Sequence, residues 1–306
     1  MKVKVGCCGF PVGMGKYYDA LETVEVNVTF YKYPSLKLLA GWRKKAPESF
    51  EFTVKAHQDL SHKLKLEWGK EAEESLKRMK EICEALKAEI LLVQTPGSLK
   101  PTEETFRRAE KFFKEARKQG LTLVWEPRGE EWFKPETKKK LKQILAKADV
   151  IHCVDPFLDK PVYTSEIAYF RLHGLGEKMY YYEYSNEELK QLKAKVSEVK
   201  NVKEVYVFFN NLSMFNDALR FKAYLEKGKF PPLSGFYGIE ALKKILEKTR
   251  FPISRKTLIE KFGWRLIEVK PGKQVTLKSI FAKLSEKNYE SLDELAKRAE
   301  EVLAKF

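Results

Sequence analysis

Apolar and polar residues alternate without a break between Val24 and Tyr31. A period of two is typical of a β-strand, and it places four apolar side chains on one face and four polar ones on the other. The polar face consists of Glu25, Asn27, Thr29 and Tyr31. Strand-like and helical segments alternate around this stretch, which indicates a parallel sheet buried on both faces. Polar side chains pointing into such a sheet are costly unless they line a site, so we expect this strand to form the floor of a pocket.

Eight segments in the first two thirds of the chain have the pattern of strands. They lie near 3–8, 22–31, 50–56, 88–94, 121–126, 149–154, 167–172 and 203–209. The clearest helical patterns between them lie at 70–87, 102–119, 135–147, 186–200 and 213–226. Their number and spacing predict an α/β fold, a (β/α)8 TIM-type barrel, in which only the connection 155–166 is too short for a regular helix. A doubly wound open sheet is the alternative, but its Gly-rich phosphate loop is missing after the first strand.

The pattern changes after Pro231 and Pro232. Helical patterns at 238–249 and 253–262 precede a strand-like run, a turn and two more helices. We therefore predict two domains, a barrel over 1–235 and a small, mostly helical module over 236–306. A packing or oligomerisation module is one interpretation of the second domain, and a nucleic-acid clamp is the other.

The 58 Lys and Arg residues outnumber the 43 Asp and Glu residues, which gives a formal charge of +15. Such an excess favours polyanionic partners, meaning nucleic acid or an anionic membrane surface. A Lys- and Glu-rich composition is also typical of thermophilic proteins, in which runs such as Lys138–Lys140 form solvated helix faces. The charge alone leaves both interpretations open.

Cysteine and histidine spacing indicates neither a disulfide framework nor a zinc motif, although Cys7 and Cys8 are adjacent. No apolar run approaches the length of a membrane span, and the first residues enter a strand rather than a signal peptide. We therefore expect a cytoplasmic protein with no membrane partner and no bound metal. A divalent cation held by Glu25, Glu126 and Asp155 is the alternative.

Charged or amide residues end seven of the eight predicted strands, and the strand ends of a barrel meet at one rim. The candidate site residues at this rim are Glu25, Asn27, Thr29, Tyr31, Lys55, Glu126, Arg128, Arg171, His173, Asn210 and Asn211. Each could have a structural role, for example as an ion pair of Lys55 with Glu126. As a set they indicate a ligand site, because each group buried without a partner costs roughly 1–3 kcal/mol. Tyr182 lies in an aromatic run beyond the seventh strand, which either stacks on a ligand or covers the barrel mouth.

Several short motifs, in collinear order over residues 1–228, resemble the YecE-like proteins, also known as domain of unknown function 72. They are Gly-Cys-x-Gly near the N-terminus, Val-Glu-x-Asn-x-Thr-Phe-Tyr, Phe-Thr-Val-Lys-Ala, Gln-x-Pro, Trp-Glu-x-Arg, Arg-Leu-His-Gly and Phe-Phe-Asn-Asn. The resemblance implies a TIM barrel similar to the endonuclease IV and xylose isomerase type, and it carries no assigned reaction. The sequence departs from the family pattern at Cys8-Gly9-Phe10, where Ser-Gly-Trp is usual, and at Pro127, where an aromatic residue is common.

The leading hypothesis is a barrel that binds a phosphate-bearing polyanion, in the first place DNA or RNA, and processes phosphodiester bonds as a nuclease. Arg128 and Arg171 would hold the phosphate, because guanidinium groups bind such anions in a two-pronged manner. Lys55 would stabilise negative charge, and Glu126 or His173 would move the proton.

Two alternatives use the same residues. The first is an isomerase, lyase or hydrolase acting on a small phosphorylated sugar-like metabolite, with Lys55 as base or Schiff-base former and Glu126 as its partner. The second is a non-catalytic binding protein.

Overall fold

The computed structural model describes residues 1–306, and the chain forms two compact units. The first unit comprises residues 1–172 and 194–210, and the second comprises residues 173–193 and 211–306. The domain boundary predicted between residues 235 and 236 stays a prediction.

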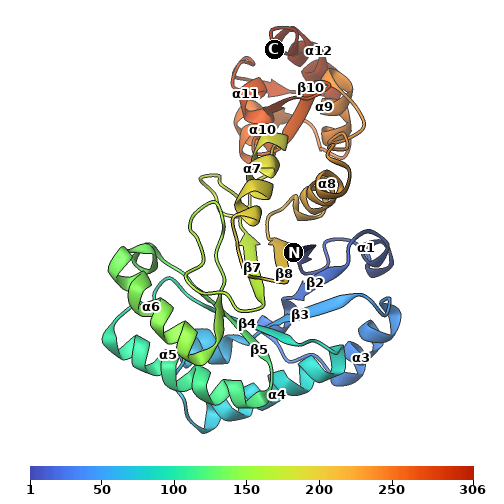
Figure 1. The fold of residues 1–306 in the computed structure, drawn as a ribbon. Helices are drawn as coiled ribbons and strands as arrows, with labels where there is room; N and C mark the ends of the chain where they lie inside the picture. Colours follow the sequence, from blue (N-terminus) through green and yellow to red (C-terminus); the bar gives the residue numbers. More distant parts are fainter. The chain divides into compact units, whose positions relative to one another are not determined.

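Eight parallel strands form the sheet of the first unit, in the order β6-β5-β4-β3-β2-β1-β8-β7 (Figure 1). They are β1 (Lys2–Cys8), β2 (Thr23–Val26), β3 (Glu51–Lys55), β4 (Ile90–Thr95), β5 (Thr122–Pro127), β6 (Val150–His152), β7 (Ile167–Leu172) and β8 (Glu204–Phe209). A parallel bridge between Val154 and Phe170 joins the two edges, so the sheet is nearly closed. The structure thus confirms the predicted (β/α)8 TIM-type barrel.

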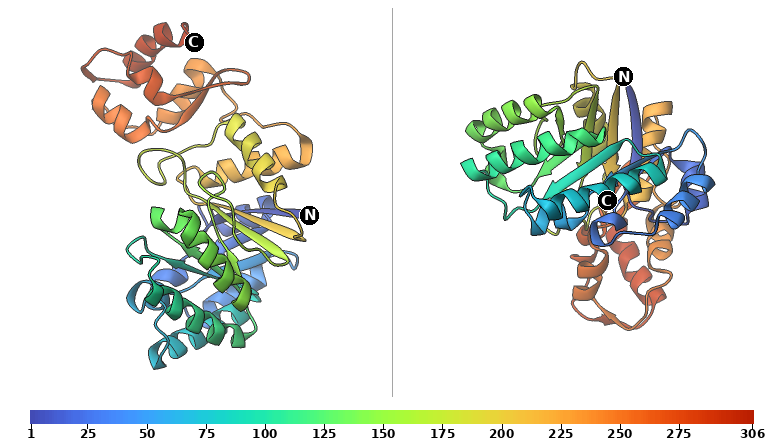
Figure 2. Two further views of the ribbon diagram at one scale, coloured as in Figure 1. Left: turned by 60° about the vertical axis from the view of Figure 1, so that its left-hand side comes forward. Right: turned by 90° about the horizontal axis from the view of Figure 1, so that it is seen from below.

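Helices connect most of the strands, and α4, α5 and α6 lie along the outside of the sheet (Figures 1 and 2). The helical segments up to β8 are α1 (Met14–Ala20), α2 (Val28–Tyr31), α3 (Leu36–Lys45), η1 (Asp59–Lys63), α4 (Lys70–Leu86), α5 (Glu103–Ala116), η2 (Arg117–Gln119), η3 (Glu130–Phe133), α6 (Pro135–Ala148) and α7 (Asn186–Ser197). The hydroxyl of Thr102 caps α5 by accepting from the Thr105 amide at 3.2 Å. The connection 155–166 contains no helix, as expected.

The interior of the barrel has an apolar middle. Its buried residues come from alternate positions of the strands, as expected for side chains that point inward. They are Cys8, Ile90, Leu92, Val124, Ile151, Cys153, Tyr169, Tyr206 and Phe208. Gly6 makes room for this packing, because a Cβ atom there would lie 2.4 Å from the carbonyl oxygen of Thr23 and 2.9 Å from the Phe208 ring.

The strand predicted over residues 22–31 is too long, and this part of the prediction is wrong. The sheet partners of β2 end early, since its last pairs are Glu25 with Cys8 and Val26 with Val54. Beyond Val26 the backbone satisfies its polar groups locally, and the amide of Phe30 donates to the carbonyl of Asn27. The polar face predicted for this strand is therefore not formed as a whole, because Thr29 and Tyr31 belong to the helical turn α2.

The second unit includes the mostly helical C-terminal part that the sequence predicts. Its elements after residue 210 are α8 (Met214–Lys227), α9 (Gly238–Leu246), β9 (Ile253–Ser254), α10 (Arg255–Phe262), β10 (Leu266–Lys270), β11 (Lys273–Thr276), α11 (Leu277–Phe281), β12 (Asn288–Tyr289) and α12 (Leu292–Leu303). One apolar cluster, with members between Ala241 and Val302, forms the core of this part. The hairpin β10–β11 and the antiparallel pair β9–β12 are its only sheets.

Replacement of Gly6 by alanine tests the close packing inside the barrel. We expect Gly6→Ala to lower the free energy of unfolding by about 1–3 kcal/mol or more, because the added methyl group meets backbone and a buried ring. Gly41→Ala is the matched control, since it adds the same group inside α3 where nothing lies within 4 Å, and it should stabilise the helix by about 1 kcal/mol. Urea unfolding of both variants measures the difference, and equal effects would contradict this account.

Candidate functional site

A cluster of buried charges lies at the C-terminal ends of the barrel strands, where TIM barrels carry their active sites. Its centre is Arg171 on β7, which is 1% exposed. Arg171 donates from Nε to Glu25 Oε2 at 3.0 Å and from Nη2 to Glu25 Oε1 at 2.9 Å, and from Nη1 to Glu126 Oε2. Neither β2 nor β5 is next to β7 in the sheet, so these bonds cross the barrel interior.

Four hydrogen bonds hold the carboxylate of Glu25. Besides those from Arg171, Oε1 accepts from Asn27 Nδ2 at 2.7 Å and Oε2 accepts from the Tyr169 hydroxyl at 2.8 Å. Complete burial alone would raise the pKa of Glu25, but the charges of Arg171 and Lys55 and the bonds from Tyr169 and Asn27 keep it below its ordinary value. Glu25 is therefore an ionised partner of Arg171.

Lys55 ends β3 and is the lysine of the cluster. Its Nζ donates to Gln94 Oε1 at 2.9 Å and lies 4.0 Å from the centre of the Phe30 ring. No carboxylate oxygen lies within 4 Å of it, in contrast to the ion pair with Glu126 that the sequence suggested. Burial and the nearby charges of Arg171 and Arg128 outweigh the attraction of Glu25 and Glu126 and lower the pKa of Lys55 to about 8.

Arg128 and Glu126 form the outer part of the cluster. Arg128 Nε donates to Glu126 Oε1 at 3.0 Å, while the other oxygen of Glu126 faces Arg171. The side chain of Arg128 is 23% exposed, so it is the most accessible arginine of the cluster. Glu126 thus links a buried guanidinium to one that reaches solvent.

Thr29, Tyr31 and Asn210 are the remaining predicted site residues of the first unit, and the first two do not lie on the expected pocket floor. The hydroxyl of Thr29 is buried and donates to the carbonyls of Val26 at 2.8 Å and Lys55 at 2.6 Å, so it fastens α2 to the end of β3. Tyr31 is 70% exposed and its ring contacts that of Phe30. Asn210 follows β8, and its amide donates to the Leu172 carbonyl at 2.7 Å.

The other three predicted site residues belong to the second unit. Asn211 is buried, and its Nδ2 donates to the Tyr182 carbonyl at 2.8 Å and to Asp217 Oδ2 at 2.7 Å. The hydroxyl of Tyr182 donates to Glu188, and burial together with Glu188 raises its pKa. His173 is buried, and its carbonyl accepts from the Tyr180 amide at 3.0 Å. Their contacts within this unit support structural roles for Asn211 and Tyr182.

The predicted site set omitted several residues that contact the cluster. Tyr169 binds Glu25 and shares a 2.8 Å hydrogen bond with Thr53, and Arg171 Nη2 lies 3.5 Å from Cys8 Sγ. Tyr169 and Thr53 lie two positions before Arg171 and Lys55, so strand parity could have identified them. Gln94 is the second-last residue of β4 and lies two positions after the inward-facing Leu92, so strand parity identifies it in the same way.

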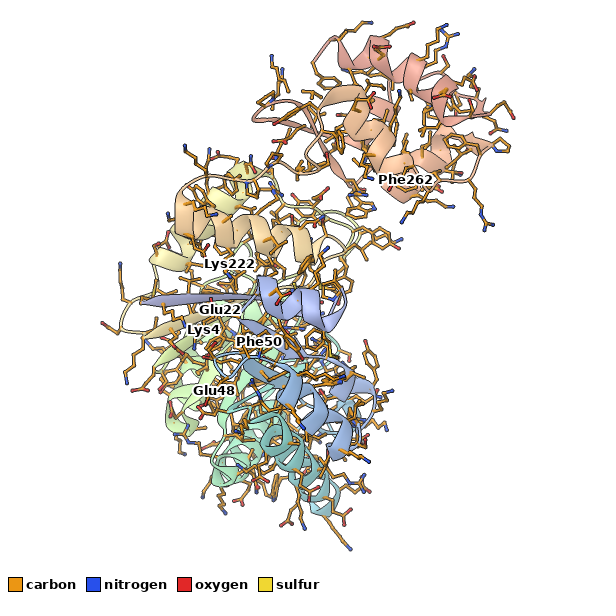
Figure 3. The ribbon with its side chains drawn as sticks, turned by 90° about the vertical axis from the view of Figure 1, so that its right-hand side faces the viewer. Lys4, Glu22, Glu48, Phe50, Lys222 and Phe262 are labelled. Atoms are coloured by element: carbon orange, nitrogen blue, oxygen red, sulfur yellow. The ribbon has the colours of Figure 1, made fainter.

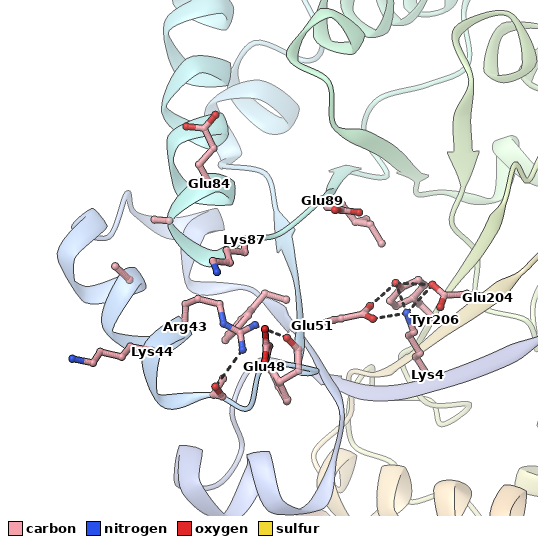
Figure 4. A pocket seen from close by; sticks show the side chains of 16 residues that line it. Lys4, Arg43, Lys44, Glu48, Glu51, Glu84, Lys87, Glu89, Glu204 and Tyr206 are labelled. Atoms are coloured by element: carbon pink, nitrogen blue, oxygen red, sulfur yellow. Dashed lines mark hydrogen bonds and ion pairs between the residues drawn. The ribbon is translucent and has the colours of Figure 1, made fainter.

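A large hollow lies at the opposite, N-terminal end of the strands. It has a volume of about 940 Å³, and residues at the starts of β1, β3 and β8 line it (Figure 4). Lys4 is buried there between Glu51 at 2.5 Å and Glu204 at 2.7 Å; Lys4 and another lining residue, Glu48, are labelled in Figure 3. This hollow contains none of the predicted site residues. The charged cluster, which contains the predicted site residues Glu25, Lys55 and Arg171 and a lysine with a lowered pKa, is therefore the candidate site.

Neither a metal site nor a membrane span is found. No group of three or more His, Cys, Asp or Glu side chains is arranged to hold a metal ion, and the carboxylate oxygens of Glu25 and Glu126 accept from Arg171 and Arg128. Every helix is too short or too polar to cross a bilayer.

These contacts define a TIM-type barrel with a charged cluster at the carboxyl ends of its strands. Residues 13–233 match the family described as "Protein of unknown function DUF72", so the chain belongs to this family, as its motifs suggested. No curated protein matches the chain.

Two crystal structures of DUF72 family proteins are similar to the chain. The protein from Enterococcus faecalis V583 is 24% identical, and the match covers 74% of this chain and 98% of that chain with a TM-score of 0.61. The protein from Thermotoga maritima MSB8 is 28% identical, and the match covers 74% of this chain and 100% of that chain with a TM-score of 0.60.

Removal of the central guanidinium should be costly. We expect Arg171→Met to lower the free energy of unfolding by about 3–5 kcal/mol, because Glu25 would keep a buried charge without its main partner. The matched control is Arg108→Met on α5, whose ion pairs with Glu67 and Glu104 are on the surface, and the expected cost there is below about 1 kcal/mol. Denaturant unfolding measures both, and a loss for Arg171→Met no larger than that of the control would contradict the assignment.

Proposed function

We propose that this protein is an enzyme in which the amine of Lys55 reacts with the carbonyl group of a small anionic metabolite, a lyase or isomerase chemistry. One observation carries the proposal. Lys55 is buried at the carboxyl end of a barrel strand, its pKa is lowered to about 8, and no carboxylate is close enough to fix it as an ammonium ion.

A lowered pKa gives a lysine its reactivity. Only the neutral amine attacks a carbonyl carbon, and an ordinary lysine with a pKa of 10.5 is almost entirely protonated near neutral pH. With a pKa of about 8, roughly a quarter of Lys55 is neutral at pH 7.5. Desolvated lysines beside other cations are the usual Schiff-base formers.

The surrounding charges support an anionic substrate. Arg128 reaches solvent beside Lys55 and suits a carboxylate or phosphate group. Arg171 has a different role from the one first expected. It is a positioning residue, because its nitrogens face Glu25 and Glu126 deep in the barrel. Glu126 likewise holds both arginines in place.

The nucleic-acid hypothesis has less support from the cluster. It requires Arg171 and Arg128 to bind one phosphate, and Arg171 is enclosed by carboxylates. The charge of +15 is what remains in its favour. The role of His173 in moving a proton also stays a prediction.

Reductive trapping tests the proposal. Incubation with glyceraldehyde 3-phosphate or pyruvate, followed by borohydride, should attach the probe to Lys55, as peptide mass spectrometry would show. The trapping rate should rise with pH around a midpoint near 8, whereas exposed lysines should continue to gain reactivity above pH 10. Lys55→Met should abolish the fast adduct, and Lys114→Met on the exposed side of α5 should leave it unchanged. Adducts spread over surface lysines, with Lys55 no faster than the rest, would contradict the proposal.

A binding assay separates the polymer hypothesis from this one. Labelled single- and double-stranded DNA and RNA are incubated with the wild type and Lys55→Met at low salt, with and without Mg²⁺. Cleavage that requires Lys55 would favour the nucleic-acid hypothesis over a small carbonyl substrate. Binding that is the same in both proteins would reflect surface charge alone.

A further inference from the structure

We propose that His62 is the proton-transfer residue of the Lys55 site, an inference that rests on the proposed carbonyl chemistry. None of the sequence motifs indicated a role for this histidine. The structure places it against the same aromatic ring that covers Lys55.

The Phe30 ring brings the two residues together. Lys55 Nζ lies 4.0 Å from the centre of this ring, and the imidazole of His62 lies 4.9 Å from it in an edge-to-face arrangement. The separation of the amine from the imidazole centre therefore cannot exceed the sum of these two distances. Across such a separation, a substrate hydroxyl group together with intervening water molecules would carry the proton.

An unusual turn holds His62 in this position. The segment Asp59–Lys63 directly after β3 is a π-helix, closed by a 2.9 Å hydrogen bond from the Leu64 amide to the Asp59 carbonyl. The next residues, Lys65 and Leu66, have positive φ angles of 49° and 64°, which residues with side chains rarely adopt. Short π-helical turns and strained backbone both concentrate at functional sites.

The charges around the imidazole favour its neutral form. Partial burial and the positive charges of Lys55 and Arg128 lower the pKa of His62 below 6.5. Its Nδ1 shares a 2.9 Å hydrogen bond with the Ser61 hydroxyl, which leaves Nε2 for proton exchange. The charged side chains on its own turn are Asp59 and Lys63, which pair with each other at 2.7 Å.

The proposed step is balanced in atoms and charge. His62 takes one proton from the Lys55 ammonium ion, and the neutral amine forms a C–N bond to the carbonyl carbon. A second proton moves from the nitrogen to the carbonyl oxygen, which gives a neutral carbinolamine. His62 then returns its proton to the hydroxyl group, which leaves as water, and the positive charge of the former ammonium remains on the iminium nitrogen.

Two measurements test this inference. In the first, the imidazole pKa of His62 is followed by NMR in ¹³C-histidine-labelled protein, whose four histidines are few enough to resolve. Its pKa should lie below 6.5 in the wild type and rise toward that value in Lys55→Met. An unchanged pKa in Lys55→Met would overturn the proposal, and this readout needs no variant at His62 and no carbonyl reaction.

In the second measurement, the rate of borohydride trapping by glyceraldehyde 3-phosphate is compared in the wild type and His62→Ala. General acid–base catalysis typically contributes about 10²-fold or more, so the variant should be slower by about that factor. Added free imidazole should restore part of the rate in His62→Ala, which it would not do for a structural defect. An unchanged rate, or a slow rate without imidazole rescue, would overturn the role of His62. Absence of any Lys55 adduct in the wild type would instead contradict the proposed function, and the NMR titration would still decide the coupling.

Discussion

The C-terminal end of the barrel strands depends on the ion pairs of Arg171 with Glu25 and Glu126. A guanidinium that is 1% exposed is tolerable only when several acceptors surround it, and two carboxylates from opposite sides of the barrel supply them. The same three charges set the electrostatic field at Lys55. Arg171 lowers the pKa of that lysine, while Glu25 and Glu126 stay too far away to form ion pairs with it.

A second buried lysine in the same barrel, Lys4, shows how close carboxylates change the pKa of such a residue. Lys4, at the other end of the strands, lies between Glu51 at 2.5 Å and Glu204 at 2.7 Å. Although burial opposes its charge, these carboxylates raise the pKa of Lys4 above 10.5. Lys55 is also buried but has an amide and a ring as neighbours, and its pKa moves the opposite way. The first environment stabilises the ammonium ion, and the second favours the neutral amine.

The sequence predicted the barrel because buried parallel strands and amphipathic helices have distinct periods. It also placed Glu25, Lys55, Glu126 and Arg171 together, since each is the last or second-last residue of its strand and has inward parity. It could not show that Arg171 is enclosed by carboxylates, because one of these partners lies 146 positions away in the chain. The alternation of apolar and polar residues continues beyond Val26, where the sheet pairing of β2 ends. For this reason the predicted strand included Thr29 and Tyr31.

The role proposed for His62 was beyond prediction for a different reason. A π-helical turn has no recognisable sequence pattern, so nothing placed this histidine near Phe30 before the structure was known. His173, Tyr182 and Asn211 were assigned to the candidate site by their positions along the chain, although they belong to the second compact unit. Order along the chain identifies strand ends well and loop residues poorly, because loops follow no fixed period.

Direct titration of Lys55 tests whether its buried surroundings lower the pKa of its amine. The Nζ resonance of ¹⁵N-lysine-labelled protein, assigned by its loss in Lys55→Met, can be followed from neutral to alkaline pH. The account predicts a transition near pH 8. A transition together with the surface lysines, above about pH 10, would show that the buried charges leave this amine unactivated.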